Sequence, residues 1–247
     1  MKIAIAGYGK MGKTIESIAK DFGYKIVAIV DTEKDWETKN KEIGQADVII
    51  EFTMPSAAPS NIRRCFNLNI PVVSGTTGWH DQTEIIKKEC LATNNTLLTA
   101  PNFSIGVNIF FYLNRYLAKI MNRMYQYDLL LEEVHHQHKL DSPSGTAKLL
   151  ADDLISLIER KESWVNSKSN DTKILQVIST RLGEVPGTHL IRYFSDFDEI
   201  EIKHTAVNRL GFARGALMAA EWIKDKKGFF TFTDLMEDLF EIIKNDK

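Results

Sequence analysis

The sequence predicts an α/β protein that begins with an open parallel sheet and continues into a second, α+β architecture. In residues 1–103, short apolar runs alternate with helical patterns, as in chains that build parallel sheets by right-handed crossovers. Residues 105–123 then form one long amphipathic helical pattern. Further strands follow, several of which alternate apolar and polar residues, which is typical of a mixed, partly open sheet.

A glycine-rich turn follows the first predicted strand, residues 2–6. The turn Gly7-Tyr8-Gly9-Lys10-Met11-Gly12 has the GxGxxG pattern, and residues 13–21 predict a helix directly after it. The glycines allow a tight turn and a close approach to a pyrophosphate, and the helix start favours negative charge. The order of strand, glycines and helix therefore predicts a Rossmann-type domain. A glycine turn without a ligand is the alternative.

Asp31 ends the second predicted strand, residues 25–30, and lies nineteen positions after Gly12. A carboxylate there can accept hydrogen bonds from the adenine-ribose hydroxyls of a nicotinamide cofactor and repels a 2′-phosphate, which favours NADH. Lys10 and Lys34 could neutralise such a phosphate, or could simply be solvated. The predicted cofactor is therefore NADH, NADPH or both.

The rest of the first half supplies three more strands, at 47–52, 70–73 and 96–99, and helices at 56–68 and 81–91. The stretch between Asp31 and Asp47 is too short for much helix. Ligands of parallel sheets bind beyond the carboxyl ends of the strands, so the turns there are expected to share one crevice. These turns are Glu51-Phe52-Thr53-Met54-Pro55, Ser74-Gly75-Thr76-Thr77-Gly78 and Thr99-Ala100-Pro101-Asn102-Phe103-Ser104.

The segment 133–147, EVHHQHKLDSPSGTA, is the most informative stretch of the chain. It follows a predicted strand at 127–134 and contains His135, His136 and His138, three of the six histidines, beside Lys139. Its serines and proline then predict a helix start before a helix over 147–160. Free N–H groups near Gly145, together with Lys139, could hold a carboxylate, while a histidine transfers a proton.

Two alternatives to a catalytic segment stay open. The three histidines with Glu132 and Glu133 could bind zinc, but neither an HExxH pattern nor a Cys/His spacing is present, so no metal is predicted. A solvated polar loop after a strand is the other alternative.

In the second half, residues 161–172 are polar and predict a mobile loop. Strands are predicted at 173–181, 188–194 and 199–204. Two final helices, at 211–224 and 234–244, carry apolar stripes that could pack back on the first domain.

The composition fits a soluble two-domain protein of 247 residues, with 26% charged residues and a formal net charge of −2. A long apolar span, a signal peptide and a basic stripe are all absent from the sequence, which argues against membrane insertion, secretion and nucleic-acid binding. Cys65 and Cys90 fit reduced thiols in a cytoplasmic protein.

The chain resembles the 4-hydroxy-tetrahydrodipicolinate reductase family, also called dihydrodipicolinate reductase, over essentially its whole length. The segments that carry the resemblance are 7–12, Phe52-Thr53, 75–78, 100–104, 133–147 and Phe212-Ala213-Arg214-Gly215-Ala216. The resemblance implies NAD(P)H-dependent reduction of a cyclic dicarboxylate, 4-hydroxy-tetrahydrodipicolinate, to tetrahydrodipicolinate with loss of water, in lysine and diaminopimelate biosynthesis. It also implies a dinucleotide-binding domain formed by residues 1–103 and 214–247. The inserted substrate domain, residues 104–213, would build a homotetramer through its sheet.

The resemblance further implies roles for single residues. His135 matches the proton donor and acceptor of the family, and Lys139 matches its second catalytic group. The implied substrate contacts are His136, Ser144, Gly145 and Thr146. The implied cofactor contacts are Gly7, Tyr8, Gly9, Lys10, Met11, Gly12, Asp31, Gly75, Thr76, Thr77, Thr99, Ala100, Pro101 and Asn102. Many members have a glycine loop one residue longer, and some have an arginine where Thr32 stands here, so recognition of a 2′-phosphate stays open.

Two other functions remain possible from the sequence. Another NAD(P)-dependent amino-acid dehydrogenase would share the first domain but has no need of the 135–146 cluster. A non-catalytic nucleotide-sensing protein could keep the first domain and bind a partner through the open sheet, although His135 and Lys139 argue against it.

Overall fold

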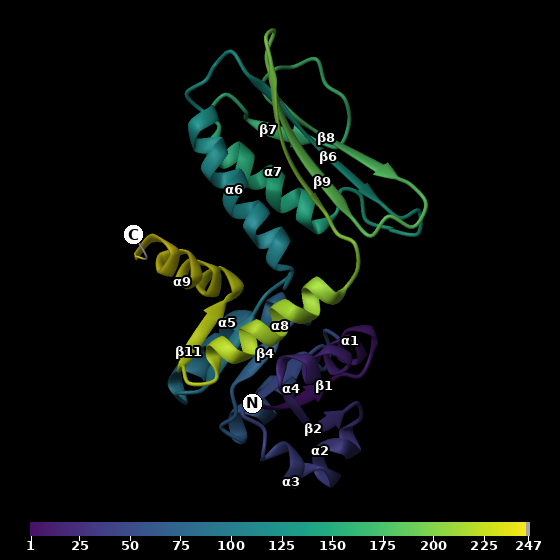
Figure 1. Ribbon diagram of the computed structural model, residues 1–247, viewed down its shortest axis with the longest axis vertical. Helices are drawn as coiled ribbons and strands as arrows, with labels where there is room; N and C mark the ends of the chain where they lie inside the picture. The colour runs from purple at the N-terminus through teal and green to yellow at the C-terminus, as the bar shows by residue number, and fades with distance from the viewer. Residues whose placement is uncertain (246–247) are drawn as a thin grey trace. The chain divides into compact units, whose positions relative to one another are not determined.

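The computed structural model describes residues 1–245, which form two compact units (Figure 1). The first unit consists of residues 1–105 together with the segment from Arg209 onward, and the second is Gly106–Asn208. In the described part of the chain, no helix is long and apolar enough to cross a membrane.

The first unit contains a six-stranded sheet in which every pair of neighbouring strands is parallel. Its order is β11-β5-β4-β3-β1-β2. The strands are β1 (Lys2–Ala6), β2 (Lys25–Val30), β3 (Val48–Glu51), β4 (Val72–Ser74), β5 (Thr96–Thr99) and β11 (Gly228–Thr231). The strand order changes direction at β1, where β2 lies on one side and β3 on the other, and ligands bind at such a point.

Helices cover both faces of this sheet, as predicted. Ile3 and Ile5 of β1 point into a core with α1, α8 and α9, whereas Ala4 and Ala6 point into a core with α3, α4 and α5. The helices are α1 (Lys10–Ala19), α2 (Glu33–Thr38), α3 (Asn40–Ile43), α4 (Ala58–Asn67), α5 (His80–Ala92), α8 (Leu210–Ile223) and α9 (Phe232–Asn245); a short 3₁₀ turn, η1 (Lys20–Phe22), follows α1. The two C-terminal helices, α8 and α9, thus pack on the first unit.

The second unit has a mixed five-stranded sheet of order β10-β9-β6-β8-β7, in which only the β6–β8 and β7–β8 pairs are parallel. Along β6, alternate residues from Leu129 to His135 are buried, and α6 and α7 pack on this inner face. Figure 1 shows both helices on the same side of the sheet. The elements are α6 (Ile105–Met121), β6 (Asp128–His135), α7 (Gly145–Leu157), β7 (Ser163–Val165), β8 (Ile174–Arg181), β9 (Thr188–Phe194) and β10 (Glu199–Thr205).

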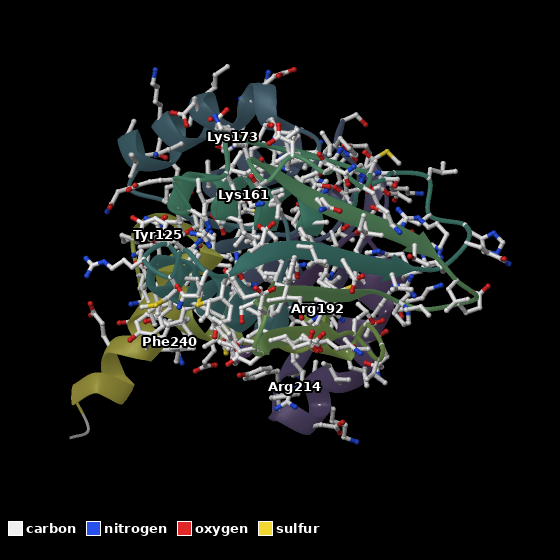
Figure 2. The ribbon with its side chains drawn as sticks, turned by 90° about the horizontal axis from the view of Figure 1, so that it is seen from above. Tyr125, Lys161, Lys173, Arg192, Arg214 and Phe240 are labelled. Atoms are coloured by element: carbon white, nitrogen blue, oxygen red, sulfur yellow. The ribbon has the colours of Figure 1, made fainter. Side chains whose placement is uncertain are left out.

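The predicted mobile loop over 161–172 is wrong in part, because residues 163–165 form strand β7 at the edge of the sheet. Lys161 is also buried: its Nζ lies 2.6 Å from Asp128 Oδ1 and donates to the carbonyl oxygen of Thr172 at 2.7 Å (Figure 2). Trp164 and Val165 are the only apolar residues in 161–172, too few to indicate a strand, and an ordered lysine cannot be told from a solvated one in the sequence. Strand β11 was also missed.

The first prediction concerns Gly215, where α8 approaches the loop after β5. A Cβ at this position would lie 1.8 Å from the carbonyl oxygen of Phe103, so Gly215→Ala has to displace the helix or the loop. We expect the free energy of unfolding to fall by about 1–3 kcal/mol in urea denaturation, because the site is overpacked.

Gly211→Ala, one turn earlier in α8, is the matched control, since its nearest neighbour would be Ser104 Oγ at 3.9 Å. Alanine in a helix should there leave stability unchanged or raise it by up to about 1 kcal/mol. Equal effects of the two substitutions would contradict the close approach at Gly215.

Candidate functional site

The glycine turn and Asp31 lie together in the first unit. The backbone N–H of Tyr8 donates to Asp31 Oδ1 at 2.8 Å, so the end of β2 is tied to the turn after β1. A cavity of about 350 Å³ opens here. Its lining includes Gly7, Tyr8, Gly9, Asp31, Glu33 and Trp36, together with Phe52 and Thr53 after β3.

The predicted turns at the ends of β3, β4 and β5 lie side by side. The Gly75 N–H donates to the Glu51 carbonyl oxygen at 2.9 Å, and the Ala100 N–H donates to that of Ser74 at 3.3 Å. The carboxylate of Glu51 is fully buried, and it accepts from the Thr53 N–H at 2.9 Å and from Thr76 Oγ1 at 2.8 Å. One buried carboxyl group therefore joins the turns after β3 and β4, two of the three turns that the sequence predicts to share one crevice.

Not every residue predicted to contact the cofactor lines the 350 Å³ cavity. Lys10 is exposed at the first position of α1, and Met11 and Gly12 continue that helix. Asn102 Oδ1 accepts from the Ser104 N–H at 2.8 Å, which shapes the loop that leads into α6. The residues at 75–77 and 99–102 lie at the ends of β4 and β5, along the edge of the sheet that also carries the cavity.

The histidine-bearing segment starts at the end of β6. His135, the last residue of this strand, is buried. His138 is exposed, and its Nε2 lies 3.5 Å from Glu184 Oε1. Nζ of Lys139 lies 2.8 Å from Asp141 Oδ1, and this contact lowers the pKa of Asp141. Lys139 thus already binds a carboxylate, supplied here by the chain itself.

The predicted helix start is confirmed, two residues earlier than expected. Ser144 caps α7, and its Oγ accepts from the Ala147 N–H at 3.1 Å. Gly145 and Thr146 are the first two residues of the helix. The first N–H groups of a helix have no acceptor within the helix, so they remain available to an anion.

Sequence analysis missed His189 and Arg181, which surround the buried carboxylate of Glu133. His189 pairs with Glu133 across β9 and β6, and its Nε2 lies 3.7 Å from Glu133 Oε2 and 3.1 Å from Ser144 Oγ. Arg181 Nη2 lies 3.3 Å from Glu133 Oε1, and His135 Nδ1 lies 3.3 Å from Oε2. One signal in the sequence could have found His189: it lies on the apolar face of a predicted strand in which apolar and polar residues alternate.

Burial and neighbours set the charge states of this cluster. Burial alone would raise the pKa of Glu133, but polar contacts with His135, Ser144 and Ser179 outweigh it and hold that pKa well below its usual range. Burial, followed by repulsion from His135, lowers the pKa of His189 to about 4. Near neutral pH the cluster therefore contains a charged carboxylate and a neutral His189.

Glu133, His135 and His189 also have the geometry of a possible metal site, since their ligand atoms all lie within 4.8 Å of one another. The surroundings oppose a cation. The Glu133 oxygens already accept from the Ser144 N–H and from the Arg181 guanidinium, and that guanidinium would repel a metal ion. The absence of a metal stays a prediction.

Comparison with known proteins places this geometry in a family. A model of the N-terminal part of dihydrodipicolinate reductase matches residues 1–103, and a model of its C-terminal part matches residues 106–236. The chain belongs to the dihydrodipicolinate reductase family. It is therefore an NAD(P)-dependent oxidoreductase, and the predicted family and enzyme class are confirmed.

Relatives cover almost the whole chain. It is 45% identical over 241 residues to a 4-hydroxy-tetrahydrodipicolinate reductase of Christiangramia forsetii, covering 98% of this chain and 100% of the relative. It is 34% identical over 261 residues to one of Archaeoglobus fulgidus, covering 96% and 100%. A dipicolinate-bound dihydrodipicolinate reductase from Paenisporosarcina sp. TG-14 superposes with a TM-score of 0.78 at 22% identity, covering 94% and 97%, which confirms the fold class.

The second prediction is a pH dependence of stability that comes from His189. In the unfolded chain a histidine binds its proton near pH 6.5, whereas folded His189 does so only near pH 4. The unfolded state therefore takes up more protons between these values, and stability falls as the pH drops through this interval. The loss should reach about 2 kcal/mol by pH 5, measured by urea unfolding at pH 7.5 and 5.

His189→Gln should remove most of this loss, because glutamine does not titrate. His80→Gln, at an exposed histidine of the first unit, is the control and should keep it. The lowered pKa of Glu133 adds a further loss of stability, but only below about pH 4.3, outside the interval tested. An unchanged pH dependence in His189→Gln would show that His189 is not held neutral.

Proposed function

We propose that this chain reduces 4-hydroxy-tetrahydrodipicolinate to tetrahydrodipicolinate with loss of water, in lysine and diaminopimelate biosynthesis. Family membership supports the reaction. The observation that carries the proposal is the segment from His135 to Thr146. This short segment brings together a buried histidine, the amine of Lys139 and a capped helix start. An amino-acid dehydrogenase or a nucleotide-sensing protein has no need of this combination.

The residues of the second unit suit an acid-assisted hydride transfer to a conjugated carbon–nitrogen system. Such a transfer builds negative charge on the ring, so a nearby acid lowers the barrier, by roughly a hundredfold or more. His135 is the proposed acid. Lys139, His136 and the first N–H groups of α7, at Gly145 and Thr146, would hold the substrate carboxylates and orient the ring.

A nicotinamide cofactor would supply the hydride, and the first unit fits its adenosine half. The glycine turn, the helix start of α1 and the carboxylate of Asp31 border one cavity. Asp31 and Glu33 line this cavity, and no lysine or arginine is among its described lining residues. Such a lining accepts the free ribose of NADH more readily than the 2′-phosphate of NADPH, so we propose NADH as the preferred cofactor.

The open face of the second sheet supports a homotetramer. Half-buried side chains of β6, β8 and β9 point away from α6 and α7, and the Arg192–Glu201 ion pair, with 2.6 Å between Nη2 and Oε1, lies on neighbouring strands (Figure 2). The apolar members of this face include Leu130, Val134, Ile174, Ile178, Leu190 and Phe194. The reaction and the buried free thiols of Cys65 and Cys90 suit the cytoplasm.

The third prediction tests the catalytic roles. With substrate generated by the preceding synthase, the chain should consume NADH, followed at 340 nm. His135→Ala and Lys139→Ala should fold and bind NADH with unchanged affinity, but should lower kcat by at least about a hundredfold. Lys139→Ala should also weaken the binding of pyridine-2,6-dicarboxylate about tenfold or more, because a charge-assisted contact is lost.

Lys148→Ala, at the fourth residue of α7, is the control and should keep wild-type turnover. A kcat/KM within a few-fold of wild type in either His135→Ala or Lys139→Ala would refute that residue's role.

The fourth prediction concerns cofactor choice. Asp31→Ser should weaken NADH binding and spare or improve NADPH binding, because the like charge beside the 2′-phosphate is removed. Lys10→Ala should weaken NADPH alone, with an effect that fades as salt rises, because Lys10 is exposed. Calorimetric dissociation constants for both cofactors at low and high salt measure these effects.

Lys20→Ala, in the turn η1 that follows α1, is the control for charge and should change neither constant. Equal losses for both cofactors in Asp31→Ser would mean that Asp31 does not contact the ribose.

A further inference from the structure

We propose that Glu133 is a positioning residue for the reduction, whose buried carboxylate fixes His135, the Lys139 turn and the start of α7 in one arrangement. This inference rests on the proposed function, because the groups that Glu133 would align are the acid and the carboxylate-binding groups proposed for that reaction. Glu133 itself is fully buried on the inner face of the second sheet and does not reach the surface.

The carboxylate of Glu133 contacts groups from several elements. It accepts from the Ser144 N–H, at 3.1 and 3.2 Å from its two oxygens, and from Arg181 of β8 at 3.3 Å. His189 of β9 lies 3.7 Å away. Taking a charge out of water is unfavourable by several kcal/mol unless donors surround it, so these groups have to stay in place around the carboxylate.

The first link leads to the anion-binding helix start. Ser144 uses its N–H for Glu133 and its Oγ for the cap of α7, and the same Oγ lies 3.1 Å from His189 Nε2. Both polar groups of this serine are therefore fixed. As a result, the free N–H groups of Gly145 and Thr146, the next two residues, keep a constant direction.

The second link leads to the acid. His135 Nδ1 lies 3.3 Å from Glu133 Oε2, a close contact but not a hydrogen bond, and among residues 1–245 this buried nitrogen has no hydrogen-bond partner. On the opposite side of the ring, Gly187 lies so close that a Cβ there would be 2.9 Å from Nε2. The ring of His135 is thus held between the carboxylate of Glu133 and Gly187, so a shift of the carboxylate would move the proposed acid.

The third link leads to Lys139. Arg181 Nη2 contacts Glu133 and also donates to the carbonyl oxygen of Asp141 at 2.6 Å. The carboxylate of Asp141 in turn lies 2.8 Å from Lys139 Nζ. The turn that carries the proposed substrate-binding amine is thus anchored to the same buried charge through one guanidinium group.

The test is Glu133→Gln, which keeps the size of the side chain and removes its charge, with Glu133→Asp as the conservative variant. For folded Glu133→Gln, we expect kcat to fall about thirty- to a hundredfold, since misplacement of a reacting group by about 1 Å has effects of that size. NADH binding should stay within twofold, and pyridine-2,6-dicarboxylate should bind several-fold more weakly. Glu133→Asp should recover part of kcat.

A second readout separates positioning from a merely structural role. The ¹⁵N resonances of the His135 ring should report a change in the surroundings of Nδ1 in Glu133→Gln, at a temperature where the variant is folded. If Glu133→Gln does not fold, Arg181→Lys is tested in its place. Lysine keeps the positive charge beside Glu133 but loses the second contact, to the carbonyl oxygen of Asp141. Arg181→Lys should weaken pyridine-2,6-dicarboxylate with little change in NADH affinity.

Glu162→Gln is the matched control, since Glu162 forms an exposed ion pair with Lys173, 2.7 Å between Oε1 and Nζ, in the same unit (Figure 2). It should match wild type in every readout. Wild-type kcat and ¹⁵N resonances in folded Glu133→Gln, with an inactive His135→Ala, would overturn this inference alone. An active His135→Ala would refute the catalytic role of His135, and a wild-type chain that consumes no NADH with the substrate would overturn the proposed function. Stoichiometric zinc that is lost with Glu133 and needed for turnover would make Glu133 a ligand instead.

Discussion

The second unit depends on a charge held away from water. Glu133 is fully buried, so its carboxylate is stable only while donors from the neighbouring strands and from the start of α7 surround it. The apolar packing of α6 and α7 on the sheet provides the low-polarity surroundings that make this requirement strict. A core that only excluded water would tolerate small shifts of the loop after β6, whereas a buried charge does not.

The first unit uses the same physical device at a different edge. Glu51 is fully buried at the end of β3, and its oxygens accept from the turns after β3 and β4. These turns continue the edge on which the glycine turn and Asp31 border the cavity. In both units a buried carboxylate at the end of a strand fixes loops that parallel and mixed sheets otherwise leave mobile.

Sequence reasoning found the parts that depend on local signals. The glycine turn, Asp31 and the capped helix at Ser144 follow from spacing and residue type, and the structure has each of them, the helix two residues earlier than expected. His189 and Arg181 could not be found in this way, because their meaning depends on the register that places them beside Glu133. Strand β7 was missed because it lies in a polar stretch, residues 161–172, which contains no longer apolar run.

The buried charge of Glu133 lowers stability at acid pH. The folded state holds His189 neutral and Glu133 charged. Its stability therefore falls as the pH drops into the range where these two groups bind protons in the unfolded chain. Replacement of the cluster by apolar side chains would remove this sensitivity and, by the behaviour of other buried ion pairs, could raise stability. It would also release His135 and the start of α7 from their shared anchor. The cluster is therefore better understood as a device for alignment than as a source of folding energy.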